Sequence, residues 1–131
     1  MSVDSIVNLC LKDVPKALAA GVVDMQSGML LAVKTIDSHP QEVLDLLAAA
    51  TKDLYEGDSV LTIERIFKRV RGVDNDERYF REIIITSTNL IHFFGRLKSR
   101  QSMIITVVCR ADANLGLVLT KAREIINKET I

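Results

Sequence analysis

Residues 80–112 read FREIIITSTNLIHFFGRLKSRQSMIITVVCRAD, a stretch that carries three consecutive apolar runs. The runs are residues 81–88, 90–97 and 103–109. Each has the length of a strand and is rich in β-branched or aromatic residues, with polar turn residues at its ends. The connections between the runs are so short that neighbouring strands can only be antiparallel. The stretch therefore predicts three antiparallel strands, and we take it as the centre of the fold.

The last of these runs is apolar on both of its faces, because side chains alternate between the two faces of a strand. One face carries Met103, Ile105, Val107 and Cys109, and the other carries Ile104 and Val108. A strand of this kind is covered on both sides. The rest of the chain is therefore expected to supply one layer above the sheet and one layer below it.

The composition predicts a single domain of 131 residues that is large enough to bury a core. With 17 basic and 17 acidic residues, the formal net charge is zero and gives no overall attraction to nucleic acid, membranes or acidic ligands. Cys10 and Cys109 lie in apolar runs and are interpreted as reduced core residues, which fits the cytosol. No run approaches the roughly 20 apolar residues of a membrane span, and no signal segment opens the sequence. We expect a soluble, cytoplasmic protein.

The first part of the chain predicts a helix and a hairpin. Residues 2–13 place apolar residues at helical spacing, and the helix is expected to end before Pro15, because the residue that precedes proline avoids the α region. Residues 16–24 and 29–35 are apolar runs on either side of a turn closed by Gly28. That pattern predicts a β-hairpin.

A long helix is predicted next, over residues 42–55. Residues 38–41 have the spacing of a capping box, with Pro40 in the first turn, and the helix is expected to stop near Gly57. Two apolar stripes run along this helix, one formed by Val43, Leu47, Ala50 and Leu54 and the other by Leu44, Ala48 and Thr51. One stripe is enough to cover a sheet. The other is surplus to a monomer and indicates a contact with another molecule.

The remaining segments complete the predicted order of elements. Residues 59–70 carry an apolar helical face, and this helix either continues the long helix past Gly57 or forms a separate piece. Residues 72–77 are polar and predict a surface loop. After the three strands, Asp112 is expected to cap a last helix. The predicted fold class is α+β, with the order α-β-β-α-β-β-β-α and a five-stranded antiparallel sheet that has helices on both faces.

This order and three strings of sequence resemble the roadblock family, which is named for dynein light-chain proteins and is widespread in bacteria and archaea. The strings are the hairpin AGVVDMQSGMLLA at residues 20–32, the long helix from Pro40, and ANLGLVL at residues 113–119. The likeness spans most of the chain as a single roadblock-like domain, residues 1–131. Residues 59–77, and Val60 to Glu77 in particular, depart from the family pattern as an insertion.

The resemblance implies a profilin-like fold with strand order 2-1-5-4-3, in which the third strand, residues 81–88, lies at a sheet edge. A flat apolar edge strand is sticky unless it is covered or paired. Family members pair edge to edge across a two-fold axis, with their long helices side by side. By resemblance we therefore expect an isologous homodimer. Its expected contact residues are Leu44, Leu47, Thr51, Ile83, Ile84 and Ile85.

The same resemblance implies a function. Roadblock-like proteins commonly act as scaffolds or regulators of Ras-like small GTPases and, in bacteria, often accompany polarity, motility or signalling systems. The expected function is therefore that of a non-enzymatic dimeric module that binds a Ras-like small GTPase or another signalling protein.

The residues themselves offer little catalytic chemistry. His39 and His92 have no local partners of the Ser/His/Asp or Cys/His kind. The Asp74-Asn-Asp76 string lacks the glycine and the glutamate of a calcium loop. No zinc spacing and no phosphate-binding glycine fingerprint is present. We expect no enzyme activity, no metal and no cofactor.

Two rival functions belong to other classes. A small-ligand sensor of profilin-like topology needs a cavity with converging polar groups, whereas the strand faces here are expected to be filled by Ile, Val and Phe. A nucleic-acid binder could use two basic clusters, residues 68–71 and 96–100, but the chain has few aromatic residues for stacking. These clusters are interpreted as solvated surface charge, and Arg71 is not taken as an arginine finger.

Overall fold

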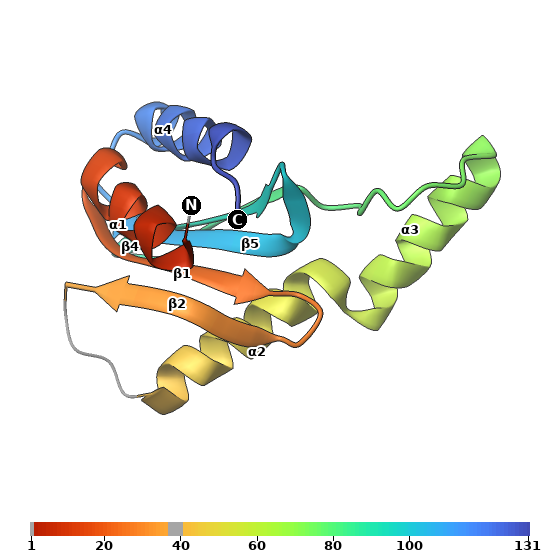
Figure 1. Ribbon diagram of the computed structural model, residues 1–131, viewed down its shortest axis with the longest axis horizontal. Coiled ribbons are helices and arrows are strands. Elements are labelled where there is room, and N and C mark those ends of the chain that lie inside the picture. Colours follow the sequence, from red (N-terminus) through yellow and green to blue (C-terminus); the bar gives the residue numbers. More distant parts are fainter. Residues whose placement is uncertain (1, 37–40) are drawn as a thin grey trace.

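The computed structural model describes residues 2–36 and 41–131, with residues 41–43 described by their backbone alone (Figure 1). The elements are α1 (Val3–Asp13), β1 (Ala17–Asp24), β2 (Met29–Thr35), α2 (Gln41–Glu56), α3 (Asp58–Arg71), β3 (Glu82–Thr86), β4 (Leu90–Leu97), β5 (Arg100–Arg110) and α4 (Leu115–Lys128). This order confirms the predicted α+β class and adds α3 to it. The capping sequence predicted around Pro40, including His39, lies outside the described residues.

The five strands form one antiparallel sheet in the order β2-β1-β5-β4-β3. This is the strand order that the resemblance implied. The strands after α3 pair as the sequence predicted, although β3 is shorter than the expected residues 81–88 and β5 begins earlier than residue 103. The sheet therefore has β2 at one edge and β3 at the other.

Helices cover both faces of the sheet, as Figure 1 shows, with α1 and α4 on one side and α2 on the other. The larger core cluster lies under α1 and α4 and contains Ile6, Phe93 and Ile105. A smaller cluster on the α2 side contains Tyr55 and Ile104. The predicted alternation along β5 is confirmed, since neighbouring residues of this strand belong to opposite clusters.

Local sequence signals set several of the boundaries. The hydroxyl of Ser2 accepts the Ser5 backbone N–H at 3.1 Å and caps α1. Gly28, with φ of 73°, closes the β1–β2 hairpin in a left-handed conformation that costs glycine little. The predicted cap of the last helix, Asp112, is corrected by two residues: Asn114 caps α4 by accepting the Leu117 N–H at 3.1 Å. Asp112 instead pairs with Lys16 at 2.9 Å.

The sequence left open whether the helical pattern of residues 59–70 continues the helix before it. In the structure this pattern forms a separate helix, α3. Gly57 has an extended backbone between α2 and α3. A Cβ at this position would lie 2.7 Å from the backbone oxygen of Asp53, so the chain turns there only with glycine. As a result α3 and the segment that follows it project away from the sheet, as Figure 1 shows.

Candidate interaction site

The edge strand β3 presents an apolar margin. Ile84 and Ile85 are each 39% exposed, while Ile83 is half-buried against the cluster under α2. The pairing of Ile83 with Phe94 and of Ile85 with His92 places both isoleucines on the α2 face, and Ile84 lies on the opposite face. The structure thus leaves the isoleucine margin uncovered in a single chain.

The backbone of β3 also has hydrogen-bonding groups that point away from β4, its one neighbouring strand among the described residues. The Arg96 N–H donates to Arg81 O and the Ser87 N–H donates to Leu90 O, both at 2.9 Å. Because backbone groups alternate in direction along an antiparallel strand, odd-numbered residues of β3 face β4. The N–H and C=O groups of Glu82, Ile84 and Thr86 therefore point outward from the sheet.

An ion pair holds this edge against α4. The guanidinium of Arg123 donates to both carboxylate oxygens of Glu82, with its shortest contact at 2.8 Å. The hydrogen bonds and the charge of Glu82 raise the pKa of Arg123. Bidentate pairs of this kind have a defined geometry, so β3 is tied to the helix on the opposite side from α2.

Helix α2 exposes part of its apolar surface. Ala48, Thr51 and Tyr55 are buried toward the sheet, and Leu46, Leu47 and Leu54 are exposed. Thr51, which the sequence analysis proposed as a dimer contact, is only 2% exposed and donates its hydroxyl to Leu47 O at 2.8 Å. Thr51 therefore belongs to the inner side of the helix and is removed from the candidate interface. Leu47, at 51% exposure, stays on its surface.

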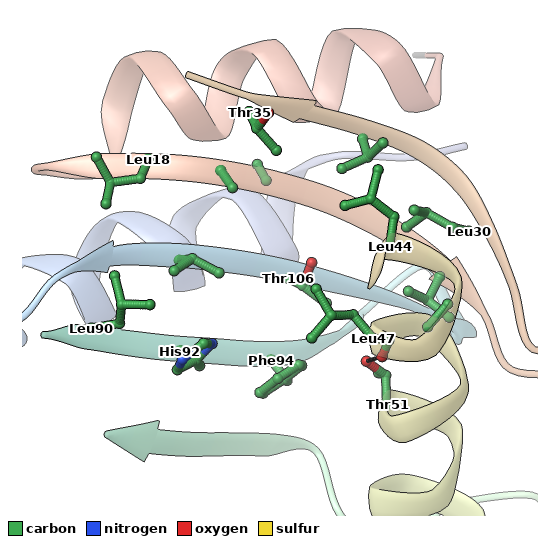
Figure 2. Close-up of a pocket in the computed structure, with 16 residues that line it drawn as sticks. Leu18, Leu30, Thr35, Leu44, Leu47, Thr51, Leu90, His92, Phe94 and Thr106 are labelled. Carbon is green, nitrogen blue, oxygen red and sulfur yellow. Dashed lines mark hydrogen bonds between the residues drawn. The ribbon is translucent and has the colours of Figure 1, made fainter. Parts of the chain in front are cut away.

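A groove lies between α2 and the sheet, with a cavity volume of about 360 Å³. Side chains from β1, β2, β4, β5 and α2 converge on it, as Figure 2 shows. The lining residues include Leu18, Leu44, Leu47, Leu90, His92, Phe94, Thr106 and Val108. The expectation that the strand faces are filled is thus correct under α1 and α4 and wrong under α2, because α2 contacts only part of the sheet.

His92 lies in the wall of this groove. Its ring is nearly parallel to that of Phe94, with centroids 6.5 Å apart. Within residues 2–36 and 41–131, its ring nitrogens have no hydrogen-bond partner. Burial lowers the pKa of His92 below its usual 6.5, so the imidazole is neutral at neutral pH.

Arg96 anchors the far end of α2. Its Nε donates to Phe80 O at 2.6 Å, one terminal nitrogen donates to Gln101 O at 2.8 Å, and the same nitrogen lies 3.4 Å from the Glu56 carboxylate. The side chain is buried, and this burial lowers its pKa. The expectation that Arg96 belongs to a solvated basic cluster is therefore wrong for this residue.

The region that departs from the family pattern is held by Glu64 on α3. This buried carboxylate accepts the Tyr79 backbone N–H at 3.0 Å and the Arg78 guanidinium at 3.1 Å, and Lys68 lies 3.7 Å away. The contacts fold the segment after α3 back along the helix. Arg71, which was not taken as an arginine finger, has its guanidinium carbon 5.5 Å from the centre of the Phe67 ring. The opposite side of α3 exposes Ile63, Ile66 and Val70.

Sequence reasoning missed Arg96, Glu64 and the groove. The alternation of side chains along β4 could have indicated that Arg96 is buried, since Arg96 shares one strand face with Leu90, His92 and Phe94. Glu64 had no such signal, because its partners Arg78 and Tyr79 come from a segment without regular structure.

The described residues hold little reactive chemistry. Cys10 and Cys109 are buried free thiols, and burial raises their pKa values to about 12 and about 11. In the described part of the chain, no group of three or more His, Cys, Asp or Glu residues could hold a metal ion. No helix among those residues is both long and apolar enough to cross a membrane.

Neither a protein-family model nor a curated protein matches the sequence. Solved structures do match the fold. The Roadblock/LC7 domain from Streptomyces avermitilis has a TM-score of 0.66 and 16% identity, over 96% of this chain and 92% of that one. MglB from Myxococcus xanthus has a TM-score of 0.67 and 17% identity, over 95% and 88%.

The gliding protein MglB from Thermus thermophilus is also similar, with a TM-score of 0.66 and 18% identity over 94% of this chain and 82% of that one. At such identities the likeness concerns the fold. The three matches cover at least 94% of this chain and at least 82% of each matched chain. Together with the strand order β2-β1-β5-β4-β3 and the helices on both faces, these matches show that the chain has the fold of a roadblock domain.

Proposed function

We propose that this protein is a non-enzymatic, homodimeric interaction module. The observation that carries the proposal is the uncovered β3 margin, where Ile84 and Ile85 are exposed beside outward-pointing backbone groups. An unpaired edge of this kind is a template for another strand. The strand that fits it best is a second copy of itself, because antiparallel pairing around a two-fold axis is self-complementary.

The proposed pairing centres on Ile84. Its N–H and C=O meet those of Ile84 in the second copy, and Glu82 meets Thr86 on either side. Leu44, Leu47, Ile83 and Ile85 lie on the α2 face and form the proposed side-chain contacts above the joined sheets. Full burial of an isoleucine contributes about 1.5–3 kcal/mol, and these partly covered side chains contribute less each.

The proposed partner of the dimer is a Ras-like small GTPase or another signalling protein of the cytoplasm. Support comes from the likeness in fold to the gliding protein MglB, and one MglB structure has a tetrameric arrangement. MglC from Myxococcus xanthus is also similar, with a TM-score of 0.54. The joined sheet and paired helices of a dimer offer the continuous surface that a protein partner needs.

The dimer is tested by light scattering of the purified chain at micromolar concentration. The expected mass is twice that of one chain, and Ile84→Asp is expected to halve it because a carboxylate at the centre of the pairing is desolvated and repelled by its copy. The matched control is Ile36→Asp, an exposed isoleucine at the β2 end of the sheet. A monomeric wild type, or equal effects of both variants, would falsify the proposed interface.

The partner is tested by calorimetric titration of the chain with purified Ras-like GTPases of its source cell. Each GTPase is loaded either with GDP or with a non-hydrolysable GTP analogue. The expected result is saturable binding that prefers one nucleotide state and weakens with Ile84→Asp. If no GTPase binds in either state, the GTPase assignment fails while the dimer proposal stands on its own measurement.

A further inference from the structure

The geometry points to a small-molecule site in the groove between α2 and the sheet. The ligand that fits is a single uncharged, mostly apolar molecule with one hydroxyl or carbonyl group, which hydrogen-bonds to His92. This inference goes beyond the interaction module proposed above and does not depend on it.

The size and walls of the groove suit a small molecule. Its volume of about 360 Å³ lies in the range of ligand pockets in proteins, roughly 300–1,000 Å³. Four strands of one sheet and a helix supply the walls, as Figure 2 shows, so the cavity is formed before any ligand arrives. The anchoring of α2 by Tyr55, which donates to Arg81 O at 3.1 Å, holds the helix wall in place.

The lining selects against charge. Leucine, valine, alanine, threonine, phenylalanine and one histidine make up the groove, and no Asp, Glu, Lys or Arg contributes to it within the described residues. A carboxylate or ammonium group would lose its water there and gain no counter-ion from these lining residues, which is costly. The apolar body of a neutral ligand instead replaces water on Leu18, Leu90 and Val108.

His92 is a polar side chain of the described lining that can both donate to and accept from a ligand. A neutral imidazole offers one donor and one acceptor nitrogen, and neither nitrogen of His92 is engaged by the part of the chain that the structure describes. Thr51 donates to Leu47 O and Thr106 donates to Gly21 O at 3.4 Å, so these hydroxyls can accept from a ligand but have no further proton to donate to it. A ligand hydroxyl or carbonyl can therefore pair with His92 while its apolar part lies along Phe94.

A second copy of the chain is the competing occupant of the groove. Among the described residues that line the groove, none comes from the proposed pairing strand β3. Leu44 and Leu47 are shared with the proposed dimer contacts. A second copy that filled the groove through these leucines would exclude the small molecule, and the experiment below detects that outcome.

The test uses three two-ring probes of nearly equal size: 1-naphthol, naphthalene and 1-naphthoate. Binding is measured by calorimetric titration, and the site is located by shifts of backbone amide signals in NMR spectra of the wild-type chain. The expected order is 1-naphthol first, naphthalene roughly fivefold weaker for want of one hydrogen bond, and 1-naphthoate at least about tenfold weaker than 1-naphthol. The shifts are expected in β4 and β5.

Two variants locate the contacts. Val108→Phe fills the groove and is expected to abolish binding of 1-naphthol, while the matched control Val70→Phe, on the exposed side of α3, leaves it unchanged. His92→Leu is expected to weaken 1-naphthol about fivefold and to leave naphthalene unaffected.

The inference is overturned if 1-naphthol shows no saturable binding, or if the NMR shifts lie outside the groove. Both measurements use the wild-type chain, so neither depends on the folding of a variant. Binding that survives Val108→Phe places the site elsewhere and also overturns it. Equal affinity for 1-naphthoate and 1-naphthol contradicts the neutral ligand class. If His92→Leu prefers 1-naphthol over naphthalene as strongly as the wild type does, the proposed hydrogen bond to His92 is wrong.

Discussion

The guanidinium carbon of Arg96 lies 4.7 Å from the centre of the Tyr55 ring, and this contact joins strand β4 to the end of helix α2. Both side chains are buried, and the ring accepts the cation on its face. Since Arg96 also binds carbonyl oxygens of Phe80 and Gln101, one cation ties α2 to the segments before β3 and within β5. The contact fastens the end of α2 to the sheet, beyond the last α2 residue that lines the groove, Thr51.

Arg96→Ala is expected to lower the free energy of unfolding by about 3 kcal/mol, measured by urea denaturation. The reason is that truncation leaves the Glu56 carboxylate and two carbonyl oxygens without their donor. The control is Arg69→Ala, an exposed residue of α3, with an expected change within about 0.5 kcal/mol. Equal small losses in both variants would show that Arg96 contributes no more than a surface residue.

Proline at the edge strand separates pairing from folding. Ile84→Pro removes an N–H that points away from β4, so the chain is expected to keep its far-UV circular dichroism spectrum and to become monomeric in light scattering. Ile85→Pro removes an N–H that faces β4 and is expected to cost about 2 kcal/mol of stability. If Ile84→Pro unfolds the chain and Ile85→Pro does not, the assigned direction of the β3 backbone groups is reversed.

Glu64→Ala is expected to release the segment after α3. The Tyr79 amide donates to this carboxylate, and hydrogen bonds to charged groups are among the stronger ones. Hydrogen exchange at the Tyr79 amide should therefore accelerate by roughly tenfold or more, while the amides of β5 keep their protection. Glu124→Ala, which removes only a surface pair with Lys121 at 3.9 Å, is the control and should leave Tyr79 unaffected.

The protein is expected to lose stability as the pH falls below the usual pKa of histidine. Burial lowers the pKa of His92 in the folded state, so the unfolded chain takes up the proton first as the pH falls through 6.5. The contribution of His92 to stability is therefore present above that value and is lost as the pH falls toward its lowered pKa. Between about pH 7 and pH 5.5, the melting temperature should fall more in the wild type than in His92→Gln.

An NMR titration of the His92 ring provides the direct measurement. A pKa at or above 6.5 would contradict the burial of the imidazole in the groove.

Much of the fold could be predicted from local patterns. The alternation in residues 103–109 placed β5 between two layers, and Gly28 marked the hairpin turn. The order of the strands came from the resemblance to a known family. The period of apolar residues along a strand does not predict it, because that period does not depend on which strand is the neighbour. The split of the helical region at Gly57 was left open, since a glycine can either bend or end a helix.

The candidate site was predicted less completely. Ile83, Ile84 and Ile85 were identified from their uninterrupted apolar run at an expected edge, and the structure places them there. Thr51 was assigned to the wrong side of α2, because two neighbouring stripes on one helix do not reveal which of them meets the sheet. Arg96 lies near Lys98 and Arg100 in sequence, so its charge suggested solvent, although its strand face suggested burial.

The sequence by itself determined where helices and strands form, because caps, turns and hydrophobic period act over a few neighbouring residues. Only the tertiary structure decided which surfaces of those elements stay uncovered. Helix α2 contacts one part of the sheet and leaves Leu18, His92 and Val108 facing a groove, and a contact between Tyr55 and Arg96 joins the end of that helix to β4. The physical reason is that the cover over a strand face is set by packing between segments far apart in the chain, which no local pattern records.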